Sequence, residues 1–220
     1  MPEIRENKYL RTTLFICIGL IYLFCLSAII GWLWDFFLLS SFSNAYISMT
    51  PVTTLTFLML GFVLIVYNYR HKLGKLMLLS EILIFISMVI SFLIITEHFI
   101  GIRVNIERLL HNIFSGFESI PIGKMSHITA INFFLIDLSL ILTMFSSDKK
   151  NIFKVTASYI ATLVASIGMI IGLGYLYGTP LLYGGIELPV PLSTSIMFIF
   201  VAMGVIISLG KEYWPLSAVI

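Results

Sequence analysis

The chain has 220 residues, of which 59% are hydrophobic and 11% are charged, and its formal net charge is +2. Soluble domains average about 25% charged and roughly 45–50% apolar residues. The composition therefore argues against a soluble globular domain, a disordered chain, a disulfide-rich secreted scaffold and a nucleic-acid-binding protein, so we expect no nucleic acid as a partner. A bilayer-spanning helix needs about 20 apolar residues, and the hydrophobic residues suffice for about six spans in one membrane domain over residues 1–220.

Six apolar runs follow one another along the chain, each close to the length of a membrane-spanning helix. They cover residues 12–33, 51–69, 74–96, 127–145, 152–176 and 191–209. The first run is longer than the roughly 7–15 residues of a signal-peptide core, and aromatic residues rather than a small-residue cleavage site follow it. We therefore predict an all-α polytopic membrane protein that retains all six helices.

Basic residues collect on one side of these spans. Ten of the thirteen Lys and Arg residues lie on the side that holds both chain ends: Arg5, Lys8, Arg11, Arg70, Lys72, Lys75, Lys149, Lys150, Lys154 and Lys211. By the positive-inside rule this side is cytoplasmic. We predict cytoplasmic N- and C-termini and a multi-pass location in the inner (plasma) membrane.

The longest connection, between 74–96 and 127–145, lies on the outer side. Its apolar residues recur at helical spacing from Ile106 to Phe117, and Asn105 stands at the N-cap position. We predict a short interfacial amphipathic helix on the outer membrane surface. A lid packed over the bundle fits the same pattern.

A short motif recurs near the start of the second, fourth and sixth runs. It consists of a Thr, a small or hydroxyl residue, an aliphatic residue, any residue and a Phe. Its Thr and Phe are four residues apart and so share one face of a helix. These pairs are Thr53 and Phe57, Thr129 and Phe133, and Thr194 and Phe198.

The spacing of the motif matches a unit of one outgoing and one returning helix. We predict three parallel two-helix repeats, approximately 1–70, 71–146 and 147–212, around an axis along the membrane normal. The motif residues would then make equivalent contacts, either as packing residues or as part of a ligand or switch site.

Polar side chains inside a membrane are costly and mark either a functional site or a buried packing contact. Asp137 lies near the middle of 127–145, Asn132 precedes it, and Glu81 lies about two turns into 74–96. We expect Asp137 to face the interior. All three are candidates for a ligand, proton or conformational-switch site, and a structural contact is the alternative for each.

Polar residues also gather where spans meet the outer surface. Five of them are candidates for an outer-face site: Glu97, His98, Tyr175, Tyr177 and Tyr183. They could line an outward-facing pocket or form an interfacial polar and aromatic belt. Their spacing matches no known metal-ligand set, and the sequence contains no catalytic or phosphate-binding motif. We predict no metal site and no enzyme activity within this chain, and the sequence leaves any cofactor unknown.

Three stretches, 96–110, 123–133 and 174–184, together resemble a region of known bacterial proteins. They begin TEHFIG, GKMS and GYLYGTP, and they are similar to the N-terminal multi-span membrane region ahead of PAS, histidine-kinase or diguanylate-cyclase modules in bacterial sensor proteins. The chain departs from that family at three positions: His127, Asp137 and Ser195, where Pro, Gly and Ala are common. The resemblance implies a membrane sensory input domain.

We therefore predict a signal-input module of a bacterial signal-transduction protein. Its expected partners are the lipid bilayer and a cytoplasmic signalling domain C-terminal to Ile220, so we expect the chain to be part of a longer protein. A homodimer is left open. The alternative is a small transporter or channel that uses Asp137 and Glu81 as relay groups. For a third function, a membrane enzyme, the sequence offers no catalytic constellation.

Overall fold

The computed structural model describes residues 8–34, 36, 41, 46–100, 124–145, 152–178 and 188–219. Six long helices cover most of these residues: α2 (Lys8–Leu33), α4 (Pro51–Asn68), α6 (Met77–Ile100), α8 (His127–Phe145), α9 (Ile152–Leu176) and α10 (Leu192–Leu209). All six are long and apolar enough to cross a membrane. The described part of the chain contains no strand, so the prediction of an all-α fold with six spans is confirmed.

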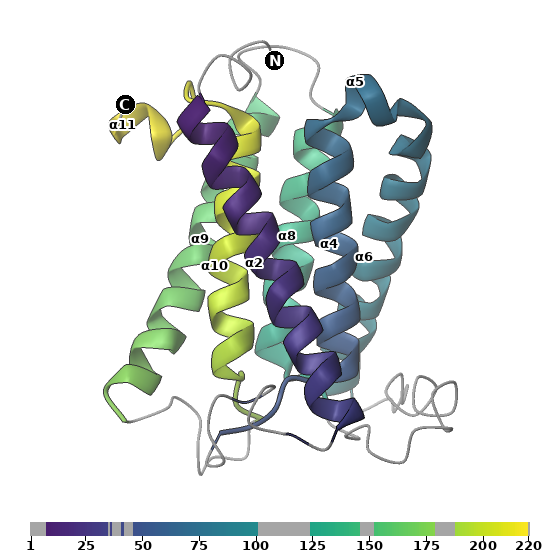
Figure 1. The fold of residues 1–220 in the computed structure, drawn as a ribbon, viewed down its shortest axis with the longest axis vertical. Coiled ribbons are helices and arrows are strands. Elements are labelled where there is room, and N and C mark those ends of the chain that lie inside the picture. The colour runs from purple at the N-terminus through teal and green to yellow at the C-terminus, as the bar shows by residue number, and fades with distance from the viewer. Residues whose placement is uncertain are drawn as a thin grey trace.

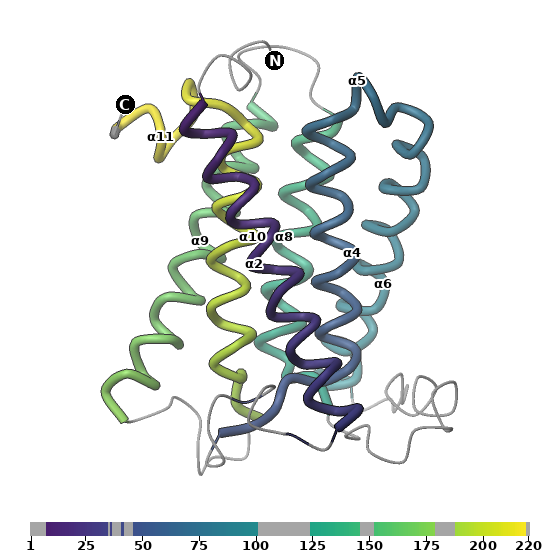
Figure 2. Tube along the Cα trace, in the orientation of Figure 1, coloured from purple at the N-terminus to yellow at the C-terminus, as the bar shows by residue number. Residues whose placement is uncertain are grey.

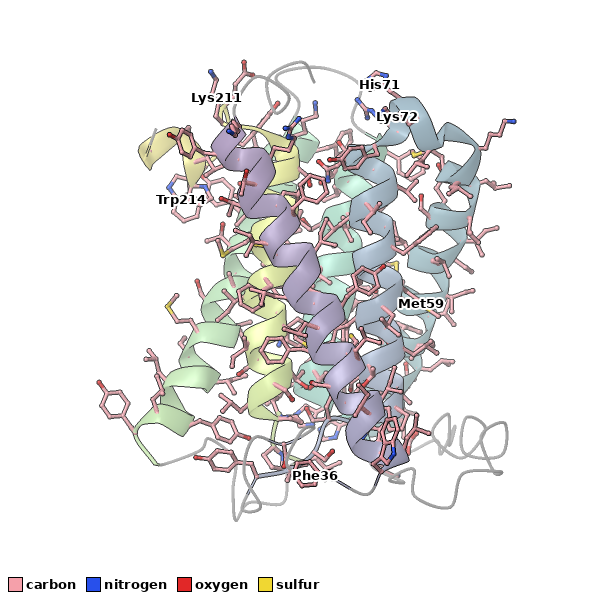
Figure 3. All side chains as sticks on the ribbon, viewed as in Figure 1. Phe36, Met59, His71, Lys72, Lys211 and Trp214 are labelled. Carbon is pink, nitrogen blue, oxygen red and sulfur yellow. The ribbon has the colours of Figure 1, made fainter. Side chains whose placement is uncertain are left out.

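Short helices mark one end of the bundle. Two of them, α5 (Arg70–Leu73) and the 3₁₀ helix η1 (Gly74–Leu76), connect α4 to α6, and α11 (Leu216–Val219) follows α10. Lys72 and Lys211 lie at this end, here called the basic end, and Phe36 lies at the other, the distal end (Figure 3). The assignment of the basic end to the cytoplasm stays a prediction.

Two predictions from the sequence concern residues that the structure does not describe. The predicted interfacial helix, from about Asn105 to Phe117, lies outside the described residues, as does Tyr183. The boundaries of the three predicted repeats also stay a prediction.

The six helices form two sets that differ in burial. In the inner helices α4, α8 and α10, 61%, 50% and 72% of the apolar 18-residue window is buried, against 39%, 28% and 28% in the outer helices α2, α6 and α9. Figure 1 shows α6 and α9 on opposite flanks of the bundle. The tube in Figure 2 shows α2 crossing the front of the bundle obliquely.

Helix contacts follow a cyclic order. Each inner helix packs against the outer helix that precedes it, in the pairs α2–α4, α6–α8 and α9–α10. Each also packs against another outer helix, in the pairs α4–α6, α8–α9 and α10–α2, and the last of these closes the ring. Because the inner helices contact one another as well, they surround a common axis, and the outer helices lie in the grooves between them.

At the distal end, α4 and α8 begin with a side-chain cap, whereas α10 does not. In α4, the hydroxyl of Thr50 accepts a hydrogen bond from the N–H of Thr53 at 3.4 Å, and in α8 the hydroxyl of Ser126 accepts one from Thr129 at 3.2 Å. Such caps satisfy N–H groups that a helix start leaves without partners. Helix α10 follows Pro191, which has no hydroxyl to make this bond.

Hydrogen bonds also join the inner helices at the basic end. The phenol of Tyr67 donates to the carbonyl of Thr143 at 3.4 Å, which links α4 to α8. The amide of Asn68 donates to the hydroxyl of Ser208 at 2.7 Å, which links α4 to α10. Polar side chains thus join the inner helices at their basic ends.

Helix α2 carries both cysteines of the chain. Cys17 and Cys25 are buried free thiols with 2% and 0% exposure. The Sγ of Cys25 lies 3.7 Å from the carbonyl oxygen of Thr54, to which it donates a weak hydrogen bond. Cys25 therefore acts as a small residue in the contact between α2 and α4.

Candidate functional site

Three phenylalanines meet on the axis of the bundle. Their ring centroids are 4.6 Å apart for Phe57 and Phe133, 4.8 Å for Phe133 and Phe198, and 5.0 Å for Phe57 and Phe198. All three residues are fully buried, and the rings meet at 60–61°. Contacts of this kind contribute about 0.5–1.5 kcal/mol each beyond area burial. This set, the Phe layer, fills the axis with one residue from each inner helix.

Three threonines lie one turn closer to the distal end. The hydroxyls of Thr53 and Thr129 are each 2.9 Å from a cap hydroxyl, that of Thr50 and Ser126 respectively. The hydroxyl of Thr194 is buried without a hydrogen-bond partner among the described residues. The cause is local, because Pro191 occupies the corresponding cap position in α10.

Asp137 is fully buried in the contact between α8 and α6. Its Oδ2 accepts a hydrogen bond from the hydroxyl of Ser87 at 2.7 Å. Its Oδ1 is buried and has no hydrogen-bond partner within the described ranges. The expected inward orientation is therefore observed, and Oδ1 is left without a hydrogen bond to the described residues.

Glu81 lies on a different face of α6. It is exposed, next to Ile82 and close to Phe85, which are 47% and 66% exposed. It precedes Ser87 by six residues, or about 9 Å along the helix axis. The structure thus does not bring Glu81 together with Asp137.

Asn132 is buried on α8 and is half satisfied. Its amide nitrogen donates to the carbonyl of Ile128 at 2.9 Å within the same helix, whereas its Oδ1 has no partner in the described part of the chain. Asn132 precedes Asp137 by five residues, so the two side chains point in different directions around α8. They do not form one polar cluster.

The outer-face candidates divide between two places at the distal end. Glu97 forms a 3.2 Å ion pair with Lys124, and the ring of His98 stacks on that of His127 with centroids 4.0 Å apart. These contacts join the end of α6 to the start of α8. His98 follows Ser87 by eleven residues, or about 16 Å along the helix, so this pair is remote from Asp137.

The two described tyrosines at the end of α9 differ in burial. Tyr175 is buried, donates a hydrogen bond to the carbonyl of Val190 at 2.7 Å and meets Tyr46 edge-on with centroids 4.8 Å apart. Tyr177, two residues on, is 80% exposed. Tyr175 therefore fastens the end of α9 to the segment that leads into α10.

Sequence reasoning missed the serines of α6. Ser80, Ser87 and Ser91 are fully buried, and Ser91 has no hydrogen-bond partner within the described ranges. Their spacing of seven and four residues in an otherwise apolar run places them on one face, a signal that was available. Within the described residues no group of three His, Cys, Asp or Glu side chains is placed to hold a metal ion.

No protein-family model matches the chain, and neither a curated protein nor a solved structure matches it. Functional inference therefore rests on the buried contacts of the inner helices.

Proposed function

We propose that this multi-pass membrane protein is a signal-input module, in which a stimulus changes how three helix pairs pack and thereby acts on a cytoplasmic effector C-terminal to Ile220. Such a mechanism needs two packings that differ by a few kcal/mol and a stimulus that favours one of them. The module itself would have no catalytic role, and its basic end would face the cytoplasm of a bacterial cell.

The observation that carries the proposal is the Phe layer. Because Phe57, Phe133 and Phe198 touch one another, a shift of one inner helix changes the contacts of the other two. The same layer fills the axis, which supports a packing role over a pore along this axis. The cyclic order of helix contacts supports three equivalent repeats, α2–α4, α6–α8 and α9–α10.

Helix α10 is suited to carry such a change toward the basic end. It is the most buried span and packs against α9, α2, α4 and α8. The segment after it turns back onto α9, where Tyr213 lies under the ammonium group of Lys154 at 6.0 Å and Trp214 stacks on Tyr159 with ring centroids 5.6 Å apart. A movement of α9 against α10 would thus reach the residues that follow α10.

A reporter fusion tests the proposal. The full chain is fused after Ile220 to a cytoplasmic kinase or cyclase domain, and output is compared for Phe198→Leu and for Phe85→Leu, a control on the exposed face of α6. Coupling energies of about 1–3 kcal/mol predict a change in output of roughly 5-fold or more for Phe198→Leu, and none for the control. Equal output from both variants at equal membrane abundance would contradict the proposal.

A small transporter is the second candidate, and the buried, half-satisfied carboxyl of Asp137 favours it. The position of Glu81 on the exposed face of α6 argues against a relay made of both carboxylates. Ion flux in proteoliposomes separates the two functions. Flux that Asp137→Asn abolishes, together with unchanged reporter output from Phe198→Leu, would favour transport.

A further inference from the structure

The contact between α6 and α8 contains two buried polar atoms, Asp137 Oδ1 and Ser91 Oγ, that have no hydrogen-bond partner in the described part of the chain. Both residues are 0% exposed. A buried polar atom without a hydrogen bond costs about 1–3 kcal/mol, and more when the group is charged. Two such atoms on packed helices are candidates for binding one shared ligand.

The register of the two helices brings these atoms toward each other. Ser87 lies opposite Asp137, and His98 lies opposite His127, so α6 and α8 run antiparallel. The ring contact of Phe92 with Phe134 agrees with this register. Ser91 therefore lies one turn from Ser87 toward the distal end, on the same face of α6.

The tilt of the side chains along the two helices turns Asp137 and Ser91 toward each other. In an α-helix the Cα–Cβ bond tilts toward the N-terminus. Asp137 on α8 thus leans toward the distal end, and Ser91 on the antiparallel α6 leans toward the basic end. The two side chains therefore lean toward each other along the helix contact, beside the hydroxyl of Ser87, which donates to Asp137 Oδ2 at 2.7 Å.

The charges of the surrounding helices favour a cation as the ligand. Asp137 is the only charged residue in α8, and α4 and α10 contain none. A neutral water molecule or a proton on Asp137 could also satisfy these oxygens, whereas a monovalent cation would in addition balance an ionised carboxylate. A divalent ion would bring excess positive charge into the membrane.

We propose that Asp137, Ser87 and Ser91 form a binding site for a monovalent cation such as Na⁺. Carboxylate and hydroxyl oxygens are hard ligands of the kind that such ions prefer. The ion would join α6 to α8 and thereby stabilise one packing of that pair. Binding stands independently of signalling, and only its role as a stimulus rests on the proposed function.

Sodium binding to the purified full chain in lipid nanodiscs tests the site. Equilibrium binding of ²²Na⁺ and the thermal midpoint are measured in NaCl and in choline chloride at equal ionic strength. The wild type should bind Na⁺ saturably and gain thermal stability from it. Asp137→Asn should lose both effects, and Ser91→Ala should weaken binding.

Ser158→Ala is the matched control, because Ser158 on α9 is also buried and its hydroxyl has no partner among the described residues. This variant should bind Na⁺ as the wild type does. If Asp137→Asn fails to fold, Ser91→Ala decides, since unchanged binding in that variant would overturn the site. A wild type that responds to pH but does not bind Na⁺ would also overturn it. Reporter output that ignores Na⁺ despite binding would count against the stimulus role alone.

Discussion

Helices α4 and α6 relate apolarity to burial in the opposite way from helices of a soluble protein, because the more apolar of the two is the less buried. Of the six spans, α6 is the most apolar and has 28% of its window buried, whereas α4 is the least apolar and has 61% buried. Lipid tails are as apolar as Leu, so an apolar side chain gains little by leaving them for the bundle. Polar and small residues gain more, and α4 buries Thr53, Thr54 and Thr56.

The largest expected effect comes from removing one ring of the Phe layer. Phe133→Ala leaves a cavity among three mutually packed residues and should lower the free energy of unfolding by about 3 kcal/mol or more. Phe85→Ala, on the exposed face of α6, should cost less than about 1 kcal/mol. Unfolding by SDS titration in mixed micelles measures both. Equal losses of unfolding free energy in the two variants would contradict the difference between buried and exposed faces.

Close approach of α9 to α10 gives the next effect. A Cβ at Gly168 would lie 2.7 Å from the backbone oxygen of Ser195, so Gly168→Ala must separate the helices and should cost about 2 kcal/mol. At Gly172 the added Cβ would meet the Ser195 hydroxyl at 3.7 Å, an ordinary contact. Gly172→Ala should therefore be neutral within about 0.5 kcal/mol. The same titration checks both, and similar costs for the two would contradict this geometry.

The hydrogen bond at the distal end of α9 should contribute less. Tyr175→Phe removes the donor to the carbonyl of Val190 and should lower the free energy of unfolding by about 1 kcal/mol. Tyr177→Phe, at an exposed position two residues on, is the control and should have no effect. Thermal midpoints in nanodiscs report the difference. A neutral Tyr175→Phe would mean that this contact does not hold α9 in place.

The smallest expected effect is the coupling of α4 to α10 at the basic end. A double-mutant cycle with Asn68→Ala and Ser208→Ala should give a coupling energy of about 0.6 kcal/mol, typical of hydrogen bonds between membrane helices. The pair Thr12 and Thr13, whose hydroxyls donate to the carbonyls of Lys8 and Tyr9 within α2, should show additive effects in the same assay. Additive effects of Asn68→Ala and Ser208→Ala would mean that this hydrogen bond does not couple α4 to α10.

The sequence predicts the fold well because the bilayer sets the length of each apolar run. The runs 51–69 and 127–145 agree with Pro51–Asn68 and His127–Phe145 to within a residue. The i, i+4 spacing also identified Phe57 and its equivalents as residues of one buried face. Periodicity is a property of one helix, so no knowledge of neighbours was needed.

The partners of the polar residues could not be predicted in this way. Asp137 was recognised by its cost in a membrane, but its contact with Ser87 depends on the rotation and register of α6 against α8. The same rotation turns Glu81 outward. These are properties of a helix pair, which the pattern of a single span does not contain.

Because Cys17 and Cys25 are buried, the native chain should react little with thiol reagents. Neither sulfur is open to a maleimide reagent, and the chain has no third cysteine. A cysteine introduced at Lys72 or at Phe36, exposed positions at opposite ends, would then be the one reactive group. Labelling of intact cells with an impermeant reagent would read the orientation of the protein directly, without first removing the native thiols.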